Sequence, residues 1–438
     1  MTSEHNDATV LIAGCGVSGR AAARLAAELG LPFALLDEQD NDSLRAFAAS
    51  LPKPPEAVYF GFRAEDALPR FERTVLSPGF RAGNPVRAKL AEVSGQLLGE
   101  LEFALSVCGK PFVGITGTNG KTTTTELTAE LFRAAGVRAC ACGNNGYAMS
   151  DAAIDCLRGK LDLPVVEISS FQLELMPVPH PVAAAVLNLA SDHIDRHGSM
   201  EAYAAAKFKL LGDPSAVGVV NALILDRFKP ADGQKFYTFS AGLPADFTMK
   251  DGSLTFRERT IISAEKLALK GVHNLENALA ALALLTAVKG ENAPFLPAVT
   301  DALAKFESGP HRLELFLTTD GVRYINDSKA TNPHAVNAAV AAVGGIRNVA
   351  AEPGRATVQK TSGRLLSVSA YRQINPSRSD RSARSANAAG TFCGRGIRRK
   401  SKNPAARKLS CAYRKPHIRN RFTKKQISKV WGFDYAEI

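Results

Sequence analysis

The chain has 438 residues, of which 45% are apolar and 7% aromatic. This length suits two to four domains, and the composition suits an α/β enzyme with buried cores. No apolar run reaches the roughly 18 residues of a membrane-spanning helix, and the polar residues 1–9 lead directly into an apolar strand. The sequence therefore predicts a cytoplasmic protein with neither a membrane span nor a secretory signal.

The net charge of +12 is unevenly distributed along the chain. Residues 351–438 hold 21 Lys and Arg against 4 Asp and Glu, whereas residues 1–350 carry a net charge of −5. The seven cysteines are scattered, and the close pair Cys140 and Cys142 has neither zinc-ligand nor redox-motif spacing. We expect the cysteines to be reduced core residues and the basicity to belong to the tail alone.

The first apolar strand, Val10–Ala13, runs into a turn with the pattern G-x-G-x-x-G at Gly14–Gly19. An alanine-rich helix follows, and the next strand ends at Asp37. In such a unit the helix amino terminus faces phosphate, and the carboxylate binds a polar group of the ligand. The pattern is typical of NAD sites, but the same turn accepts any diphosphate, including a nucleotide-linked substrate. The segment Ser77–Gly79 follows another strand and forms either a second turn at this sheet edge or an ordinary tight turn.

A second strand, at 113–116, is followed by a glycine-rich turn, a lysine and two threonines, Gly117–Thr123. The two glycines allow backbone N–H groups to point at phosphate oxygens without interference from a Cβ atom. Lys121 supplies positive charge for the β and γ phosphates, and the Thr122 hydroxyl can bind Mg²⁺. The common phosphate-binding loop has a further glycine where this chain has Ile115. The segment predicts a nucleotide-triphosphate site, and the alternative is a glycine turn beside a solvated lysine.

Two polar residues follow later strands of the same alternating strand–helix pattern. Glu167 ends one strand, and His193 follows the next strand, between Asp192 and Asp195. The alternation predicts a parallel sheet, in which ligands collect at the carboxyl ends of the strands. A carboxylate and an imidazole near triphosphate oxygens are plausible Mg²⁺ ligands, although a histidine at a strand end is usually structural. Lys207, on the next helix, is by composition a solvated lysine.

Six segments of the chain are informative when taken together. They are GTNGKTT, EISSFQLE, LNLASDHIDRHGSMEAYAAAK, GVHNLENALAA (Gly271–Ala281), GPHRLE (Gly309–Glu314) and INDSKATNP (Ile325–Pro333). They resemble the Mur ligases of peptidoglycan synthesis. SSFQLE and NDSKATN, with the single amino-terminal glycine fingerprint, resemble the D-glutamate-adding members specifically. The resemblance covers about residues 8–349.

The resemblance implies an α/β protein of three domains. These are a Rossmann-like domain for the UDP-substrate at 1–102, a P-loop ATPase domain at 103–308, and an amino-acid-binding domain at 309–438 that is family-like only to about residue 349. It also implies a monomeric, ATP-dependent ligase that joins D-glutamate to UDP-N-acetylmuramoyl-L-alanine through an acyl phosphate. A carboxylate is a poor electrophile, so phosphorylation supplies a leaving group, and Mg²⁺ with Lys121 neutralises charge on the transferred oxygens.

The resemblance also assigns roles to individual positions. The UDP group is expected at Gly14, Val17, Ser18, Gly19, Asp37, Ser77, Pro78 and Gly79. The muramoyl-alanine part is expected at Asn144, Asn145, Ser169 and Gln172, with Thr331 as a further substrate contact. ATP is expected at Gly117, Thr118, Asn119, Gly120, Lys121, Thr122, Thr123, Asn274, Asn277, Arg312, Asp327 and Lys329.

Two Mg²⁺ ions are expected on Thr122, Glu167, His193 and Lys207. Lys207 matches the family lysine that carries CO₂ as a carbamate. A carbamate is an anion, so it could bind a second Mg²⁺ that a protonated or neutral amine would not hold. Lys121, Glu167, His193 and Lys207 are therefore the expected catalytic residues.

Two pairs of these residues have simpler explanations. Asn274 and Asn277 could be helix caps, although a cap needs only one short polar side chain. Asp327 and Lys329 could be a surface pair at a strand end. The resemblance favours nucleotide contacts for both pairs.

The resemblance ends abruptly after residue 349. The family's glycine-rich turn with a lysine is missing there, as are the later serine and phenylalanine for D-glutamate. Residues 351–438 are rich in Ser, Arg and Asn and show no periodic apolar pattern that would build a core. A change of reading frame, a substituted terminus or a disordered basic arm would each explain this change, and the first is favoured. An incomplete D-glutamate site would impair ligation.

Two other functions fit parts of the sequence. Another ligase of the same fold, such as folylpolyglutamate synthetase, shares the phosphate-binding loop, although the first glycine turn and Asp37 argue against it. A nucleic-acid-binding protein would use the basic tail to neutralise phosphates. The tail has few aromatics and no recognisable module, so only non-specific binding is expected.

Overall fold

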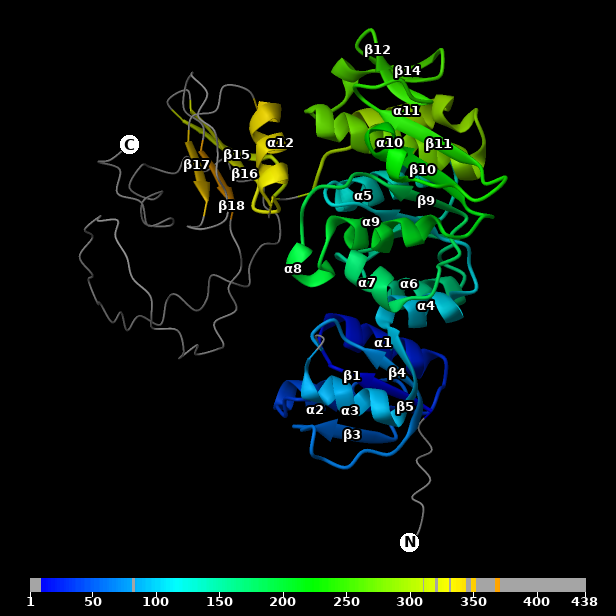
Figure 1. The fold of residues 1–438 in the computed structure, drawn as a ribbon, viewed down its shortest axis with the longest axis vertical. Coiled ribbons are helices and arrows are strands. Elements are labelled where there is room, and N and C mark those ends of the chain that lie inside the picture. The colour runs from blue at the N-terminus through cyan, green and yellow to red at the C-terminus, as the bar shows by residue number, and fades with distance from the viewer. Residues whose placement is uncertain are drawn as a thin grey trace, which may run out of the picture. The chain divides into compact units, whose positions relative to one another are not determined.

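The computed structural model describes residues 9–80, 83–309, 311–319, 322–330, 332–343, 348–351 and 367–370. Within these residues the strands form three separate sheets, each accompanied by helices (Figure 1). This arrangement confirms the α/β prediction. Three sheets are also compatible with three domains, and the proposed limits at residues 102 and 308 stay predictions.

The first sheet has five parallel strands in the order β3-β2-β1-β4-β5. Every residue of the central strand, β1, is buried, as expected for a parallel sheet that is covered by helices. This order is typical of doubly wound sheets, whose ligands bind at the carboxyl ends of the strands. The elements are β1 (Val10–Ala13), α1 (Val17–Glu28), β2 (Phe33–Asp37), α2 (Asp42–Ala49), β3 (Ala57–Phe60), β4 (Phe71–Leu76), α3 (Pro85–Val93) and β5 (Ser94–Gly99).

Short polar residues start two of these helices. The Asn41 side chain accepts a hydrogen bond from the Leu44 N–H at the start of α2. The Asn84 side chain accepts from the Val86 N–H at the start of α3, and Pro85 occupies the first turn. Both arrangements satisfy amide groups that the first helical turn leaves without partners.

The second sheet has nine strands in the order β14-β13-β12-β11-β10-β9-β6-β8-β7. Neighbouring strands from β7 to β12 are parallel, and β12, β13 and β14 are antiparallel. The strands are β6 (Val113–Thr116), β7 (Ala139–Gly143), β8 (Leu163–Glu167), β9 (Ala183–Val186), β10 (Val217–Asn221), β11 (Phe236–Ser240), β12 (Phe247–Lys250), β13 (Ser253–Phe256) and β14 (Arg259–Ser263).

Helix α10 is a strongly apolar helix that packs with this sheet. Its alanines and leucines from 278 to 285 are all fully buried, and it contacts α5 and β9–β12. The helices of this region are α4 (Glu100–Cys108), α5 (Lys121–Ala134), α6 (Met149–Leu157), α7 (Ser170–Leu175), α8 (Ile194–His197), α9 (Met200–Phe208), α10 (Val272–Lys289) and α11 (Pro297–Lys305). Short 3₁₀ turns are η1 (Lys209–Leu211), η2 (Ala222–Arg227), η3 (Ala264–Lys266) and η4 (Ala293–Phe295).

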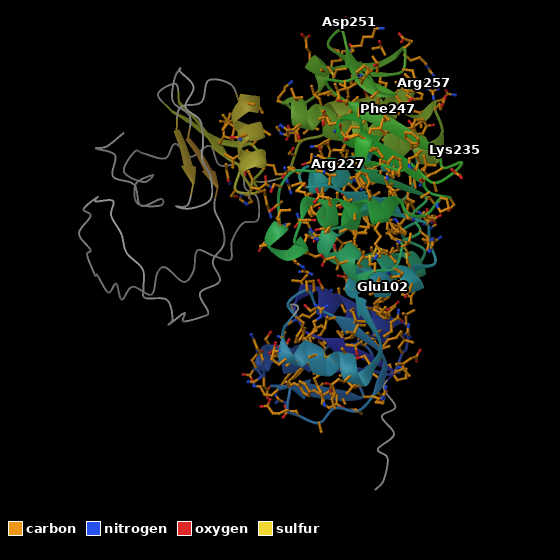
Figure 2. The ribbon with its side chains drawn as sticks, viewed as in Figure 1. Glu102, Arg227, Lys235, Phe247, Asp251 and Arg257 are labelled. Carbon is orange, nitrogen blue, oxygen red and sulfur yellow. The ribbon has the colours of Figure 1, made fainter. Side chains whose placement is uncertain are left out.

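The antiparallel strands β12–β14 end in tight turns (Figure 2). Asp251 has a φ of +48° and Arg257 a φ of +52°, so both turns place a residue in the left-handed region. Phe247 and Phe256 pair at the end of β12 and β13 opposite the Asp251 turn, next to Arg257; Phe247 is fully buried, and the two rings stack with centroids 4.5 Å apart. The Asp251 turn at one end of this hairpin and the aromatic pair at the other fix its register.

The third sheet has four strands in the order β15-β16-β18-β17. Its elements are β15 (Glu314–Thr319), β16 (Val322–Asn326), α12 (Pro333–Val343), β17 (Asn348–Ala351) and β18 (Ser367–Ala370). β18 lies between β16 and β17 and is parallel to both. β18 lies in the segment 351–438, in which the sequence shows no periodic apolar pattern that would build a core. Residues 371–438 lie outside the described part of the chain.

Five cysteines from four segments of the chain gather in one core. Cys15, Cys108, Cys142 and Cys156 are buried in the same cluster, and Cys140 packs against it. All five thiols are free, which confirms the prediction of reduced residues for these five. In the described ranges, no helix is both long and apolar enough to cross a lipid bilayer.

Candidate active site

The phosphate-binding loop lies between β6 and α5, as predicted. Gly120 is the N-cap of α5 and has a φ of +84°. A Cβ atom there would lie 2.3 Å from the Asn277 Oδ1 atom, so only glycine allows this close approach. Among the described residues, no side chain caps α5. Its first N–H groups therefore remain available for an anion at the helix amino terminus.

Two lysines converge on one carbonyl oxygen of this loop. Lys121 Nζ donates to the Gly117 oxygen at 3.0 Å and to the Thr118 oxygen at 2.9 Å. Lys207 Nζ donates to the same Gly117 oxygen at 2.8 Å. Lys207 is 2% exposed, so its interpretation as a solvated lysine is wrong. Helix composition did not reveal this burial because the loop that covers Lys207 lies 90 residues earlier in the chain.

Burial lowers the pKa of both lysines. It lowers the pKa of Lys207 to about 6, with a further contribution from the positive charge of Lys121. Burial also lowers the pKa of Lys121, and the negative charges of Glu167 and Asp192 oppose that effect. Lys207 is therefore neutral at pH 7, a form that can act as a nucleophile toward CO₂.

Thr122 and Glu167 form an oxygen-rich group beside the loop. Thr122 Oγ1 donates to Glu167 Oε2 at 2.7 Å, and Asn144 Nδ2 donates to Glu167 Oε1 at 2.8 Å. Asn145 Nδ2 donates to Thr122 Oγ1 at 3.3 Å. A cavity of about 90 Å³ is lined by Thr122, Thr125, Glu126, Ala141, Cys142, Asn145, Gly146, Tyr147 and Glu167. A hydroxyl and a carboxylate at such a cavity fit the oxygen ligands that Mg²⁺ prefers.

His193 has different neighbours from the other predicted metal ligands. His193 adopts the left-handed backbone conformation with a φ of +55°, and the centre of its ring lies 4.8 Å from that of Phe171. His193 Nδ1 lies 3.7 Å from an oxygen of Asp192. Among the described residues, there is no group of three or more His, Cys, Asp or Glu side chains that could hold a metal ion. The structure thus joins Thr122 to Glu167, and metal binding by His193 and Lys207 stays a prediction.

Asn274 and Asn277 do not cap α10. Its N-cap is Gly271, and both asparagines are buried. Thr124 Oγ1, on the phosphate-loop helix, donates to Asn277 Oδ1 at 3.2 Å, and Asn277 Nδ2 donates to Asn274 Oδ1 at 3.2 Å. The pair therefore joins α10 to α5 next to Gly120, and a contact of these residues with ATP stays a prediction.

Ser169 and Gln172 have a structural role at the start of α7. Ser169 is the N-cap, and the two residues form a reciprocal capping box. Ser169 Oγ accepts from the Gln172 N–H, and the Ser169 N–H donates to Gln172 Oε1 at 2.9 Å. The arrangement fixes the segment that follows Glu167. Their predicted contacts with the muramoyl-alanine substrate are not tested by this geometry.

Arg312, one of the expected ATP contacts, influences the residues around the phosphate loop through its charge. The positive charge of Arg312 lowers the pKa of Lys121 and of Glu126, although burial raises that of Glu126 overall. Asp327 is buried, and its Oδ1 accepts from the Leu313 N–H at 3.2 Å. Burial raises the pKa of Asp327. Lys329 is exposed, and Thr331 lies outside the described residues.

The amino-terminal glycine turn brings its predicted residues together at the carboxyl end of β1. A Cβ atom on Gly19 would lie 1.8 Å from the Gly14 carbonyl oxygen, so glycine is required for α1 to approach the turn. Asp37 Oδ2 accepts from the Cys15 N–H at 2.7 Å. A Cβ atom on Gly14 would lie 2.6 Å from that of Ser77, which places the Ser77–Gly79 turn against the first one. Val17 is exposed and Ser18 is half-buried at the start of α1.

Comparison with known proteins agrees with this geometry. A profile of the Mur ligase middle domain matches residues 115–285. A UDP-N-acetylmuramoylalanine--D-glutamate ligase of Caldanaerobacter subterraneus is 34% identical over 348 residues, which are 78% of this chain and 76% of that protein. The chain belongs to the Mur ligase family. A Mycolicibacterium vanbaalenii protein of the same name is 37% identical over 351 residues, 76% of this chain and 70% of its own.

Solved structures support the same fold for this Mur ligase family member. UDP-N-acetylmuramate-alanine ligase of Thermotoga maritima gives a TM-score of 0.53 at 17% identity, covering 83% of this chain and 95% of that one. A murein peptide ligase of Psychrobacter arcticus gives 0.50 at 15% identity, covering 82% and 95%. At these identities the similarity concerns the fold, and it confirms the predicted Mur ligase architecture.

The structure adds site residues that sequence reasoning missed in this Mur ligase. Asn188 exchanges hydrogen bonds with the Asn119 backbone, accepting from its N–H at 2.9 Å and donating to its oxygen at 3.0 Å. Asn332 Nδ2 donates to Asn119 Oδ1 at 3.0 Å and to Asp192 Oδ2 at 3.1 Å. Asn188 follows the end of β9, and Asp192 lies next to His193. Their positions after a strand were therefore the sequence signal that could have identified both as site residues. The Asn332 contact joins residues 213 positions apart and has no local signal.

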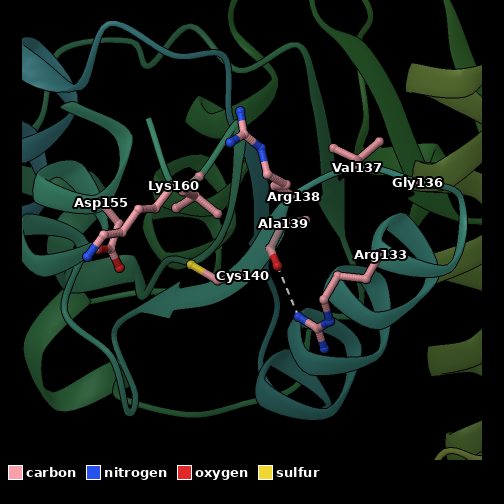
Figure 3. Close-up of a pocket in the computed structure, with 9 residues that line it drawn as sticks. Arg133, Gly136, Val137, Arg138, Ala139, Cys140, Asp155 and Lys160 are labelled. Carbon is pink, nitrogen blue, oxygen red and sulfur yellow. Dashed lines mark hydrogen bonds and ion pairs between the residues drawn. The ribbon is translucent and has the colours of Figure 1, made fainter. Parts of the chain in front are cut away.

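A larger hollow lies away from these residues, beside β7 (Figure 3). Its volume is about 460 Å³, and it is lined by Arg133, Gly136, Val137, Arg138, Ala139, Cys140, Asp155, Lys160 and Leu161. Arg133 donates to the Ala139 carbonyl at 3.0 Å. The three cations all pair with carboxylates, those of Glu130, Asp155 and Asp162. The compensated charges favour a structural role for these side chains.

Proposed function

We propose that the chain is an ATP-dependent ligase that joins D-glutamate to UDP-N-acetylmuramoyl-L-alanine in peptidoglycan synthesis. The observation that carries this proposal is the 34–37% identity to proteins named for that reaction, over 76–78% of the chain. Lys121 at the phosphate loop supports it, because a ligase of this kind must neutralise a triphosphate during phosphoryl transfer.

In this proposal the phosphate loop binds ATP through its N–H groups and through Lys121. The free amides at the start of α5 point at the phosphates, and the Lys121 ammonium exchanges its carbonyl partners for phosphate oxygens. Asn277 and Thr124 hold α10 against α5 beside Gly120, which keeps the loop in position. The aligned γ phosphate can then be attacked by the substrate carboxylate to give an acyl phosphate and ADP.

Thr122 and Glu167 would hold Mg²⁺, which neutralises charge on the transferred phosphoryl oxygens. Asn144 fixes the Glu167 carboxylate by donating to its second oxygen. Lys207 would carry CO₂ as a carbamate for a second ion, and its lowered pKa supports this role because only the neutral amine reacts with CO₂. His193 would complete the metal ligands after a change in its side-chain position.

The UDP group would bind at the amino-terminal glycine turn, with Asp37 holding a polar group of the ligand. The amine of D-glutamate would attack the acyl carbon, and phosphate would leave from the tetrahedral intermediate. The same proposal holds that the protein acts as a monomer in the cytoplasm. The alternative function is that of another ligase of the same fold. Dependence of turnover on the UDP-substrate distinguishes the two functions.

The test is phosphate release by the full chain with ATP, Mg²⁺ and UDP-N-acetylmuramoyl-L-alanine, with and without D-glutamate. The expected result is release that depends on D-glutamate, with a product mass increased by one glutamyl residue. Release that depends on another amino acid would change the proposed acceptor. The absence of turnover in protein that binds both ATP and the UDP-substrate would contradict the second half-reaction.

A further inference from the structure

Ser170, His197 and Glu174 form a hydrogen-bonded chain that the ligase mechanism above does not use. Ser170 Oγ lies 3.0 Å from His197 Nε2, and Glu174 Oε1 lies 2.8 Å from His197 Nδ1. The His197 side chain is 2% exposed. Burial lowers its pKa, and the negative charge of Glu174 opposes that effect. In the neutral ring, Nδ1 donates to Glu174 and Nε2 accepts from the Ser170 hydroxyl.

The connectivity of these three groups is that of a serine–histidine–carboxylate triad. A nucleophilic serine must be reachable by a substrate carbonyl, and Ser170 is only 3% exposed. Neither of the two hollows described above is lined by Ser170 or His197. The burial of the hydroxyl therefore argues against hydrolysis and in favour of a connecting role.

The hydrogen bonds of His197 connect α7 to α8 at the carboxyl edge of the second sheet. Ser170 and Glu174 belong to α7, which follows Glu167 after two residues. His197 is the last residue of α8, and its N–H donates to the carbonyl of His193. Fixing His197 against α7 therefore also fixes the segment that carries Asp192. That carboxylate influences the pKa of both site lysines.

Aromatic contacts reinforce this connection. The Arg196 guanidinium lies 3.9 Å from the centre of the Phe171 ring, and Arg196 Nη2 lies 2.9 Å from Glu174 Oε2. The His197 ring stacks on Phe171 with centroids 5.6 Å apart. Cation–π and stacking contacts of this kind add to the hydrogen bonds and restrict movement of α8 relative to α7.

His197 also contacts the helix that carries Lys207. Its ring lies 5.1 Å from that of Tyr203 on α9. The Tyr203 hydroxyl lies 3.0 Å from Thr118 Oγ1 of the phosphate loop, and Lys207 Nζ lies 4.6 Å from the centre of the Tyr203 ring. A single buried imidazole thus touches the segments that carry Glu167, Asp192 and Lys207.

We propose that His197 is a positioning residue of the ligase. Through Ser170, Glu174 and Tyr203 it holds the Glu167, Asp192 and Lys207 segments in the arrangement that Mg²⁺–nucleotide binding and phosphoryl transfer require. The proposal rests on the proposed ligase function. Residues that orient metal ligands through hydrogen bonds commonly change metal affinity or activity by about 10- to 100-fold when replaced.

The test compares the variants H197A, H197Q and S170A in the full chain. In H197A all three contacts are lost, and we expect kcat for phosphate release to fall about 10- to 100-fold while KM for the UDP-substrate changes little. The glutamine amide of H197Q can reach the Ser170 hydroxyl, so we expect it to restore part of kcat. S170A should lower kcat less than H197A and should have no further effect in the H197A background, because both changes remove the same bond.

A second readout is independent of turnover. Binding of a non-hydrolysable ATP analogue is measured by calorimetry across a Mg²⁺ titration, and the half-saturating Mg²⁺ concentration should rise several-fold in H197A and S170A. This readout separates failure of the inference from failure of the proposed function, since it requires neither the UDP-substrate nor D-glutamate. The matched control is H180A, because His180 also pairs with a carboxylate, that of Asp213 at 2.8 Å, but is 79% exposed.

Two results would overturn the proposal. One is unchanged Mg²⁺ dependence in H197A and S170A, whatever their effect on thermal unfolding. The other is covalent labelling of Ser170 by a fluorophosphonate that H197A abolishes, which would show an accessible nucleophile. H180A should behave as the unchanged chain in both assays. If H197A does not fold, H197Q and S170A still decide the question.

Discussion

Two strand–glycine–helix turns in this molecule share a backbone design and differ in the side chains around it. Both α1 and α5 begin at a glycine N-cap, and neither start has a side-chain cap within the described residues. Both therefore leave N–H groups for an anion. At α5 the loop adds Lys121 and Thr122, whereas at α1 the carboxylate of Asp37 takes the Cys15 N–H. The same backbone device can thus serve two ligands, and the adjacent side chains determine which.

The glycines of the two turns also meet different neighbours. At Gly19 the close contact is with the Gly14 carbonyl of the same turn. At Gly120 it is with Asn277, from a helix that is more than 150 residues away in the chain. The first turn is therefore a local unit, and the second depends on long-range packing. Substitutions in each turn can test this difference.

The largest effect is expected from removing the charge of the second turn. K121M removes the ammonium that lies on the phosphate loop, and we expect kcat for phosphate release to fall about 10²- to 10³-fold, as for the loss of other groups that stabilise transition-state charge. Steady-state kinetics would measure it. K110M is the matched control, because Lys110 lies at a surface pair with Asp162. Equal rates in the two variants would contradict the role of Lys121.

A smaller effect is expected from G120A. The new Cβ atom would lie 2.3 Å from Asn277 Oδ1 in a residue with a φ of +84°. A left-handed conformation alone costs about 1–2 kcal/mol for a non-glycine residue, and the collision adds to that cost. Chemical denaturation and ATP-analogue binding would measure the loss. G136A is the control, because Gly136 has a φ of +79° with no atom within 4 Å of the new Cβ. Similar losses of stability and binding would show that the Asn277 contact does not matter.

A selective effect is expected from G19A in the first turn. Its Cβ atom would lie 1.8 Å from the Gly14 carbonyl, so α1 must move away from the turn. We expect KM for the UDP-substrate to rise about tenfold, equivalent to about 1.4 kcal/mol, while binding of the ATP analogue is unchanged. G16A is the control, because nothing lies within 4 Å of a Cβ atom there. A loss of ATP binding in G19A would mean that the two turns are not independent.

The last prediction concerns the pH dependence of the free energy of unfolding. The pKa of Lys207 is about 6 in the folded chain and near 10.5 when it is unburied, so between these values the unfolded chain binds one more proton. The free energy of unfolding should therefore rise with pH across this window. In CO₂-free buffer, K207M should be less dependent on pH than the unchanged chain, as measured by urea unfolding at several pH values. Parallel pH profiles for the two proteins would contradict the lowered pKa.

The local parts of the fold and site were predictable from the sequence. The two glycine turns, the strand ending at Glu167 and the parallel sheets follow from short patterns with a known backbone geometry. The capping box of Ser169 and Gln172 was also visible in principle, since its residues are three apart. The sequence assigned these two residues to substrate because the resemblance was stronger than the local helix signal.

The remaining parts depend on contacts between distant segments. The burial of Lys207 depends on Gly117, and the Asn332 bonds depend on Asn119, so neither has a signal in its own neighbourhood. The hydrogen-bonded chain through His197 likewise joins α7 to α8 across 27 residues. Strand β18 was missed because its four residues are too few for a periodic pattern. Tertiary packing decided each of these features.

The bonds of Lys121 to its own loop have a consequence for binding thermodynamics. Because the ammonium bridges the Gly117 and Thr118 carbonyls, the loop is ordered by the chain itself, and its conformational entropy is lost during folding. Nucleotide association then exchanges one set of hydrogen bonds for another without ordering the backbone. Such preorganisation lowers the entropic cost of association. Less of the favourable enthalpy of the phosphate contacts is therefore offset by lost entropy, and the affinity is higher.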